Sequence, residues 1–416
     1  MTTTTGVSLS QDELAEIYVD LHAHPELGLQ EHRTAGIVAE KLRGFGYEVT
    51  EGVGGTGVVG ILQRGDGPTV LLRADMDGLP VTEQTGLDYA SVATAEVDGR
   101  VTGVMHACGH DVHITALLGA AAALVDDQDW AGRIMAVFQP AEEPGSGAKA
   151  MIDDGLFDRF GTPVVVLGQH VAPMPAGSFG LHAGVSYAAS EGMTIIVHGK
   201  GGHGSRPETT VDPIVLGANI VTRLQQIVSR EIAPQQVGVV TVGAFNAGQA
   251  PNVIPETAEL QVSTRSFDPA VHDTLSAAIE RIAKGEAAAA GAPREPEIVS
   301  QYSFPLLVND PDGIERLRGA LTADIPGAMI IDQGVVTGSE DVGAFATAAG
   351  VPCVYWVLGG ADPALFADAK TLEDAVAVAL KLPSNHSPKY APVIEPTLTM
   401  GVAAMRSAAR AWLTIT

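Results

Sequence analysis

The sequence predicts an α/β protein in which a mixed-sheet main domain is interrupted by a smaller α+β domain. Short, continuous apolar runs recur along the chain, with helix-like segments between them. Strands buried on both faces of an α/β sheet are typically apolar throughout, whereas half-exposed strands alternate apolar and polar residues. From about residue 190 to 296 the pattern changes to alternating strands and two long helical segments, which favours a separate inserted domain.

The elements of the main domain are predicted from these apolar runs. We expect buried strands at residues 58–62, 69–73, 133–138, 164–167 and 353–358. We expect helices at residues 12–21, 33–45, 111–125 and 397–413. These elements assign residues 1–188 and 299–416 to the main domain.

The inserted domain is predicted at residues 189–298. Its alternating strands are expected at residues 193–198, 238–242 and 258–264, and its helices at residues 213–233 and 268–290. Alternation indicates that each strand has one buried and one open face, so we expect helices to cover one face of a small sheet.

The charge balance and the cysteine count exclude several classes of protein. Asp and Glu number 49 against 24 Lys and Arg, and the net charge of −25 disfavours nucleic acid and membrane surfaces as partners. Two cysteines, Cys108 and Cys353, are too few for a disulfide framework. The first ten residues do not have the pattern of a signal peptide, and no apolar run reaches the roughly 18 residues of a membrane span. We therefore expect a cytoplasmic protein.

The densest polar cluster, MHACGHDVH at residues 105–113, leads directly into a predicted apolar helix. Cys108 and His110 are two residues apart, a spacing that does not share a helix face, so we expect both in the turn before the helix, with Asp111 as its N-cap. Cysteine and histidine side chains that converge on one loop are typical zinc ligands. The cluster therefore predicts a metal site, although a single buried histidine is more often structural.

Three further polar clusters follow predicted strands. Glu142 and Glu143 come after the strand at 133–138, His170 after the strand at 164–167, and the segment RADMDG (73–78) at the end of the strand at 69–73. Open α/β sheets place their sites at the carboxyl ends of strands. Neighbouring side chains of extended backbone point in opposite directions, so one glutamate can bind a metal while the other acts as a general base.

Two other interpretations use the same residues. The segments at 52–57 and 55–60 both match G-x-G-x-x-G, but a dinucleotide site needs a helix after this motif, and here a strand is predicted. Cys108 could alternatively be a thiol nucleophile with a histidine base, which would leave the paired glutamates without a role.

A set of motifs resembles the amidohydrolase branch of the M20 metallopeptidase family, which holds hippurate hydrolases, N-acyl-amino-acid deacylases and auxin-conjugate hydrolases. The motifs occur in family order between about residues 12 and 405. They are HPEL (24–27), RADMD (73–77), LP (79–80), MHACGHD (105–111), QPAEE (139–143), GKGGH (199–203), NVIP (252–255), GSED (338–341) and HSP (386–388).

The resemblance implies a catalytic domain of the dinuclear-metal exopeptidase type. Its two divalent ions, which could be Zn, Mn, Co or Ni, would be bound by Cys108, His110, Glu143, His170 and His386. Glu142 matches the general base that takes a proton from the attacking water, and Asp77 is expected beside the ligands. The implied substrate is a small N-acyl-amino acid, hydrolysed at its amide bond.

The resemblance also implies that the inserted domain is a lid through which the protein forms a homodimer. His203 matches a residue that helps to hold the substrate carbonyl oxygen, and Asn252 and Arg265 match positions thought to bind substrate. Glu208 departs from the family pattern, in which a Pro-His pair is common, so we expect the local polarity of the pocket to differ while the reaction type stays the same.

Two alternatives stay open within and beyond this family. One is a metal-dependent dipeptidase or carboxypeptidase that acts on small peptides. The other is a relative without activity that binds an amino-acid conjugate.

Overall fold

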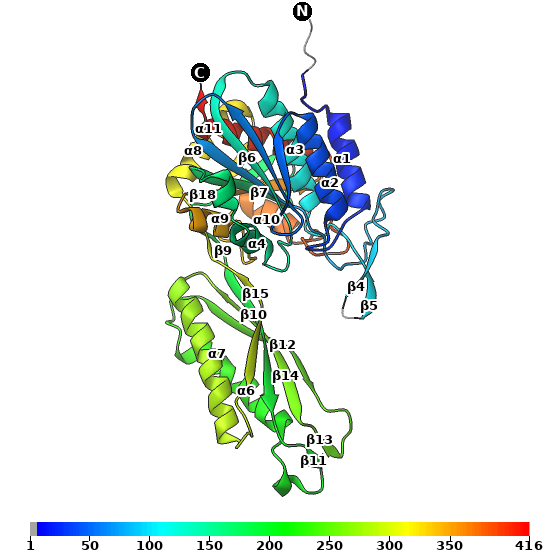
Figure 1. Cartoon of the computed structure of the whole chain (residues 1–416), viewed down its shortest axis with the longest axis vertical. Helices are drawn as coiled ribbons and strands as arrows, with labels where there is room; N and C mark the ends of the chain where they lie inside the picture. Colours follow the sequence, from blue (N-terminus) through cyan, green and yellow to red (C-terminus); the bar gives the residue numbers. More distant parts are fainter. Residues whose placement is uncertain (1–5, 98, 416) are drawn as a thin grey trace, which may run out of the picture. The chain divides into compact units, whose positions relative to one another are not determined.

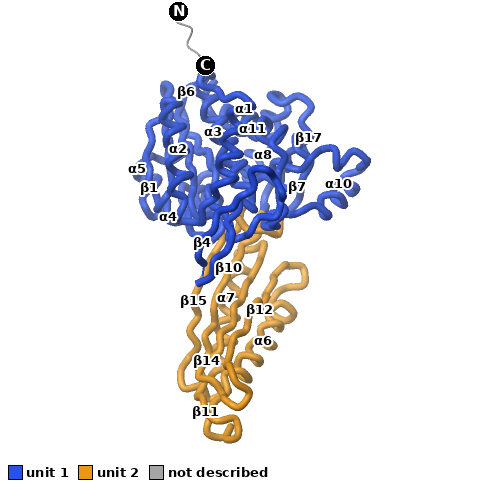
Figure 2. Tube along the Cα trace, turned by 90° about the vertical axis from the view of Figure 1, so that its right-hand side faces the viewer, with its two compact units in different colours: residues 1–186, 308–335, 341–416 blue, residues 187–307, 336–340 orange. Residues whose placement is uncertain are grey.

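The computed structural model describes residues 6–97 and 99–415. The first five residues, part of the N-terminal segment predicted not to be a signal peptide, lie outside this range. The chain forms two compact units (Figure 2). Unit 1 contains the described residues of Met1–Ser186, Val308–Val335 and Asp341–Thr416, and unit 2 contains Tyr187–Leu307 and Val336–Glu340. The predicted α/β fold with a mixed sheet is confirmed.

Unit 1 is built on a nine-stranded mixed sheet (Figure 1). Its order is β1 (Glu48–Val53), β2 (Gly57–Arg64), β6 (Trp130–Gln139), β3 (Thr69–Asp75), β7 (Val165–Pro175), β18 (Cys353–Ala361), β8 (Ser178–Gly180) and β17 (Met329–Ile331), with β19 (Thr414–Ile415) paired to β6. The central strands β6, β3, β7 and β18 run parallel, whereas β1 and β2 are antiparallel to their neighbours. Polar residues at the carboxyl ends of the parallel strands therefore meet at one edge.

Helices cover both faces of this sheet. One group, whose members contact one another, is α1 (Gln11–Ala23), α2 (His32–Gly44), α3 (His110–Asp126), α8 (Pro311–Asp324) and α11 (Thr397–Trp412). The other group is α4 (Gly147–Asp153), α5 (Leu156–Phe160) and α9 (Gly343–Ala349). Gly60 of β2 lies against Leu42 of α2, and Gly57, three residues earlier in the strand, lies against Met151 of α4. Residues an odd number apart in a strand face opposite ways, so the two groups lie on opposite faces.

The remaining elements of unit 1 are short. They are β4 (Thr94–Val97), β5 (Arg100–Gly103), η2 (Pro363–Phe366) and α10 (Leu372–Ala379), and β9 (Gly184–Tyr187) and β16 (Leu307–Asn309) lie at the unit boundaries.

The start of α3 differs from the sequence-based prediction. The helix begins at His110, and its N-cap is Gly109 in the left-handed region at φ 83°, so the assignment of Asp111 as N-cap was wrong. A glycine tolerates this conformation without steric cost, and it lets the chain turn sharply from the Cys108 loop into the helix. The glycine motif at residues 52–60 runs into strand β2 and not into a helix. It therefore lacks the helix that a dinucleotide site needs.

Unit 2 has a four-stranded antiparallel sheet of order β12 (Gly238–Ala247), β14 (Thr257–Ser266), β10 (Ala189–His198) and β15 (Glu297–Phe304). Helices α6 (Pro213–Arg230) and α7 (Pro269–Ala289) pack on it, and β11 (Gly202–His203), β13 (Val253–Ile254) and η1 (Pro207–Thr209) complete the unit. The continuous stretch of this unit extends to Leu307, past the predicted boundary at residue 298, because β15 pairs with β10.

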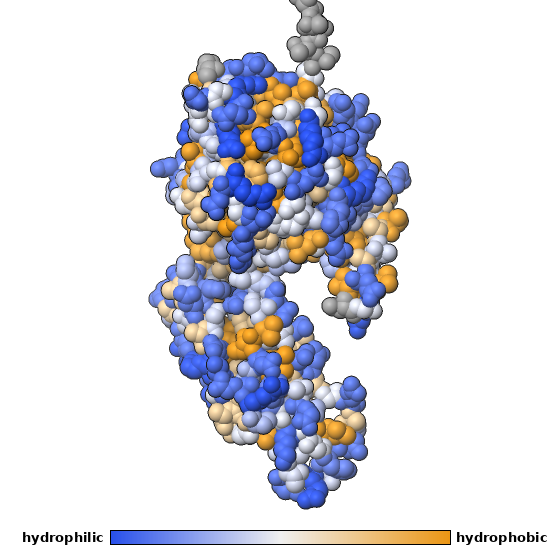
Figure 3. All heavy atoms as spheres, viewed as in Figure 1, coloured by the Kyte–Doolittle hydropathy of each residue, from blue (hydrophilic) through white to orange (hydrophobic). Residues whose placement is uncertain are grey.

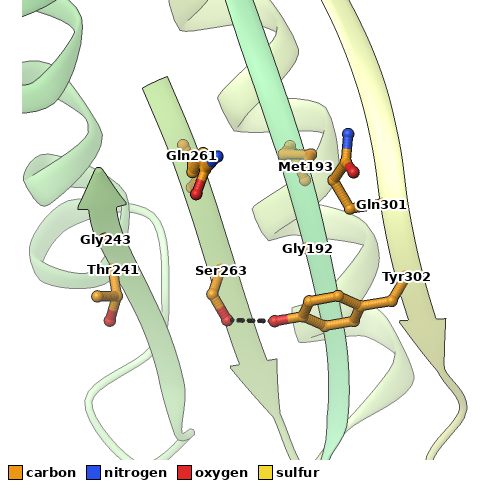
Figure 4. Close-up of a pocket in the computed structure, with 9 residues that line it drawn as sticks. Gly192, Met193, Thr241, Gly243, Gln261, Ser263, Gln301 and Tyr302 are labelled. Carbon is orange, nitrogen blue, oxygen red and sulfur yellow. Dashed lines mark hydrogen bonds between the residues drawn. The ribbon is translucent and has the colours of Figure 1, made fainter. Parts of the chain in front are cut away.

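The sheet of unit 2 has one apolar and one open face. Leu260 and Val262 of β14 join the core beneath the helices, whereas Gln261 and Ser263 point the other way into a hollow. Figure 4 shows this face, where Tyr302 makes a hydrogen bond of 3.0 Å with the Ser263 hydroxyl. The alternation seen in the sequence therefore has its expected structural cause.

Hydrophilic side chains cover much of the face of the molecule drawn in Figure 3, in keeping with the excess of acidic residues. Among the described helices, none combines the length and the apolar character that crossing a bilayer demands.

A buried ion network anchors α1 to α3. His22 of α1 donates from Nδ1 to Asp111 at 2.6 Å, and its Nε2 lies 3.1 Å from Glu83. Burial opposes the charge on the ring, but the two carboxylates outweigh burial and raise the pKa of His22 to about 10. His22 is therefore a buried cation held between two anions at neutral pH.

This network predicts a pH-dependent contribution to stability. Because the folded-state pKa of His22 exceeds the ordinary value of 6.5, its stabilisation is fully present below that pH and is lost as the pH rises through about 10. We expect His22→Gln to be less stable than the wild type at pH 6.5, and the difference in free energy of unfolding to shrink by pH 10. Urea unfolding of the chelator-treated protein measures this difference. The control His24→Gln changes an exposed ring. A difference in free energy of unfolding between His22→Gln and the wild type that is the same at both pH values would contradict the assignment of His22 as a buried cation.

Candidate metal centre

Five side chains from distant parts of the chain meet at the carboxyl edge of the unit 1 sheet. Cys108 and His110 lie where the chain enters α3, Glu143 in the turn after β6, His170 in β7, and His386 in the segment before α11. Cys108 Sγ is 3.4 Å from His170 Nε2, and Glu143 Oε1 is 3.8 Å from His110 Nε2 and 3.3 Å from His386 Nε2.

Two positions differ in detail from the predictions. His110 is the first residue of α3 rather than part of the preceding turn. His170 lies within β7 rather than after its end, because β18 pairs alongside and extends the strand to Pro175.

The five side chains fall into two groups of possible ligand atoms that share one member. Cys108, His110 and His170 form the first group, and Cys108, Glu143 and His386 form the second. Within each group the ligand atoms lie within 4.8 Å of one another. Thiolate, imidazole and carboxylate are the donor set of zinc and related divalent ions.

The hydrogen bonds of two ligand histidines use Nδ1 and leave Nε2 directed into the cluster. His110 donates from Nδ1 to the Asp77 carbonyl at 2.8 Å, and His170 donates from Nδ1 to the Val171 carbonyl at 2.8 Å. In the neutral ring, each bond places the proton on Nδ1 and leaves the lone pair on Nε2, which is the form that binds an ion. Nε2 of His110 and Oε1 of Glu143 are buried without a hydrogen-bond partner among the described residues. Buried polar atoms rarely stay unsatisfied, so this pattern fits a bound cation.

The carboxylates around the centre create a negative potential that favours a positive charge there. Burial alone would lower the pKa of His110, but the neighbouring carboxylates Asp75 and Asp77 raise it to about 10. Burial and the carboxylates Glu143 and Glu142 raise the pKa of the Cys108 thiol well above its usual range. A cysteine in such surroundings is a poor nucleophile on its own, because the thiolate is the reactive form.

His113 has both ring nitrogens in use and lies outside the two groups. Its Nδ1 is 2.5 Å from Asp75, and its Nε2 accepts from the Val171 N–H at 2.8 Å. Asp75 in turn accepts from Arg73 at 2.6 Å. Although Asp75, His110 and His113 lie close together, this set has no free pair of donors for an ion.

Two buried carboxylates hold the turn that carries the paired glutamates. Asp77 accepts from the N–H of Glu142 at 3.1 Å and from that of Glu143 at 3.0 Å. Glu31 accepts from the N–H of Ala141 at 2.8 Å, at a residue with φ 48°. Three successive N–H groups are thus bound by side chains, which fixes the directions of Glu142 and Glu143.

The sequence analysis did not predict two residues of this site. One is Glu31, and the other is Asn385, whose amide contacts the Cys108 loop. A glutamate within the polar run before α2 carries no signal that it will be buried. Asn385 had one available signal, since it directly precedes His386 in the sequence.

The predicted residues of the inserted domain lie in unit 2. His203 of β11 is exposed, and its Nδ1 accepts from the Ser205 N–H at 3.1 Å, so the neutral ring carries its proton on Nε2. Asn252 lies beside it, because its carbonyl accepts from the Gly204 N–H at 2.9 Å. Arg265 lies apart, on β14, and donates to the Thr337 carbonyl at 2.8 Å. Glu208 is exposed, at 3.4 Å from Arg206.

A sequence model of the peptidase family M20/M25/M40 matches residues 71–384, a span that holds Cys108, His110, Glu143 and His170. The chain belongs to peptidase family M20. Hippurate hydrolase of Campylobacter jejuni is 44% identical over 309 residues, covering 73% of this chain and 77% of that protein. Thermostable carboxypeptidase 1 of Saccharolobus solfataricus is 38% identical over 356 residues, covering 84% of this chain and 86% of that protein.

A solved structure of a dinuclear metal-binding M20 peptidase from Bacillus subtilis superposes with a TM-score of 0.73 at 27% identity, covering 96% of this chain and 97% of that one. The family and these relatives make this M20 protein a hydrolase that acts on amide bonds.

The hydrogen bonds of Asp77 generate a test of the glutamate turn. In Asp77→Asn one acceptor oxygen becomes an N–H donor that faces the N–H of Glu142 or Glu143, so the turn should shift. Loss of such a contact typically costs about 10–100-fold in metal affinity or activity. Elemental analysis after dialysis measures the metal retained. The control Asp66→Asn makes the same change on an exposed carboxylate, and equal metal content in both variants would contradict the role of Asp77.

Proposed function

We propose that this M20 protein is a metal-dependent amidohydrolase that cleaves the amide bond of N-acyl-amino acids. The observation that carries the proposal is the convergence of five ligand side chains, with two histidine tautomers fixed, beside the buried Glu142. Hippurate is an N-acyl-amino acid, and the similarity to a hippurate hydrolase supports this substrate class.

Cys108, His110, Glu143, His170 and His386 would hold two divalent ions in this proposal. Bound there, the ions would lower the pKa of a bound water toward roughly 7 and polarise the scissile carbonyl. The thiolate and imidazole donors favour zinc, while Mn, Co and Ni are compatible with the same set. The metal-binding M20 peptidase of similar fold supports two ions per chain.

Glu142 would move the proton. Its Oε2 lies 3.9 Å from the ligand nitrogen of His110, and its backbone is held by Asp77. A carboxylate in this position can take a proton from the attacking water and return it to the leaving amine. Glu143, whose side chain contacts His386, would stay bound to the ion.

His203 would act as a hydrogen-bond donor to the substrate carbonyl oxygen. Its Nδ1 is occupied by Ser205, so Nε2–H is the group that can donate. Loss of one such donor typically costs about 10²–10³ in rate. Asn252, which lies beside it, and Arg265 are proposed to contact substrate, and unit 2 is proposed as the surface of a homodimer.

A carboxypeptidase activity is the second candidate, supported by the similarity to Thermostable carboxypeptidase 1. Both reactions cleave an amide whose amine side is an amino acid with a free carboxylate. Release of amino acids from N-benzoyl- and N-acetyl-amino acids, compared with release from unblocked dipeptides, distinguishes the two.

Metal content and amine release test the proposal together. We expect one to two ions per purified chain, and amine release from N-acyl-amino acids that chelation abolishes and added metal restores. Cys108→Ser should lower the metal content. A chain without metal, whose activity is blocked by thiol alkylation, would overturn the proposal in favour of a thiol nucleophile.

The paired glutamates offer a matched comparison. Glu142→Gln should keep its metal and lose at least about 10²-fold in kcat, because a positioned general base contributes about 10²–10⁴-fold. Glu143→Gln makes the same chemical change one residue away and should instead lose metal. Steady-state kinetics with elemental analysis separates the two effects. Turnover of Glu142→Gln within tenfold of the wild type would remove Glu142 from the reaction.

A further inference from the structure

We propose that Asn385 is a positioning residue that ties together the three segments carrying Cys108, His170 and His386. This inference rests on the proposed metal centre and extends it to a residue that binds neither the ion nor the substrate. Asn385 directly precedes His386 and is half-buried between the Cys108 loop and β7.

The Asn385 amide donates both of its N–H groups to ligand-bearing backbone. Nδ2 lies 3.0 Å from the carbonyl oxygen of Cys108 and 3.1 Å from that of Val171. Both neighbours are acceptors only, so the NH₂ group and not the oxygen must face them. Nδ2 also lies 3.9 Å from Cys108 Sγ.

The Val171 carbonyl connects Asn385 to His170. This oxygen accepts from Nδ1 of His170 at 2.8 Å and from the hydroxyl of Tyr390 at 3.2 Å, in addition to Asn385. The His170 bond sets the tautomer that leaves Nε2 free for an ion. Asn385 therefore holds the Val171 carbonyl, which orients His170, and it also holds the backbone of Cys108.

The backbone next to Asn385 delivers the last ligand. The N–H of His386 donates to the Ala107 carbonyl at 2.8 Å, which docks this segment on the loop before Cys108. His386 adopts φ 70°, a left-handed conformation that costs a non-glycine residue free energy and needs its surroundings to hold it. The Asn385 side chain and the His386 N–H together provide that support.

Removal of this contact should affect both groups of ligands, because Cys108 belongs to each of them. In Asn385→Asp a carboxylate without an N–H faces two carbonyl oxygens and the sulfur, so every contact becomes repulsive. In Asn385→Ala the contacts are simply absent. We expect each variant to bind Co²⁺ about 10–100-fold more weakly than the wild type, with Asp the weaker of the two.

The test is a titration of chelator-treated full-length protein with Co²⁺, followed by optical absorption. A cysteine thiolate bound to Co²⁺ gives a near-ultraviolet charge-transfer band, which reports on Cys108 without any assay of activity. We expect the two Asn385 variants to show a weaker or shifted band and a larger Kd. Lys389→Ala removes an exposed side chain of the same segment and leaves the Asn385 contacts in place, so its band should match the wild type.

The outcomes separate this inference from the proposed function. A wild-type protein that takes up no Co²⁺ would reject the metal centre itself. A wild type that binds Co²⁺, together with Asn385 variants of unchanged Kd and unchanged band, would overturn the role of Asn385 alone. Circular dichroism of the chelator-treated proteins checks the fold. If Asn385→Asp does not fold, the Kd and the absorption band of the uncharged Asn385→Ala are compared with those of the wild type.

Discussion

The structure of unit 1 depends on compensating the negative charge that it buries at one edge of its sheet. Asp75, Asp77, Glu142 and Asp341 are all buried there, and Arg73 is the sole buried Lys or Arg in the part of the chain that the structure describes. Arg73 bonds to Asp75 and Asp341, and these contacts satisfy a part of the charge. Taking carboxylates out of water is costly unless each one is paired or hydrogen-bonded, so the rest must find other partners.

Some of the buried carboxylates are satisfied by backbone N–H groups, and others by a buried ion network. Asp77 is satisfied by two N–H groups of the glutamate turn, whereas Asp111, behind the centre, is paired with the protonated His22. On the ligand side of the cluster, Oε1 of Glu143 and Nε2 of His110 are buried without a hydrogen-bond partner among the described residues. One arrangement of charges thus both holds the fold together and leaves a place for cations, so stability and metal binding are coupled.

The sequence predicts those parts of the molecule that depend on local pattern. Continuous apolar runs identify β2, β3, β6 and β18 because both of their faces are buried, and the Cys108 cluster stands out by its composition. Where the outcome depends on backbone geometry or on contacts between distant segments, local pattern fails. Gly109 moves the start of α3 by its left-handed φ, pairing with β18 prolongs β7 past His170, and Asn385 meets Cys108 across 277 positions.

The last of the proposed ligands lies near the end of the chain, and an entire second unit is encoded between it and the other four. His386 can meet the other four side chains only when the chain closes the long loop that contains this second unit, and closing a long loop costs conformational entropy. A cation bound by all five side chains would therefore cross-link two distant stretches of unit 1 and offset part of that cost.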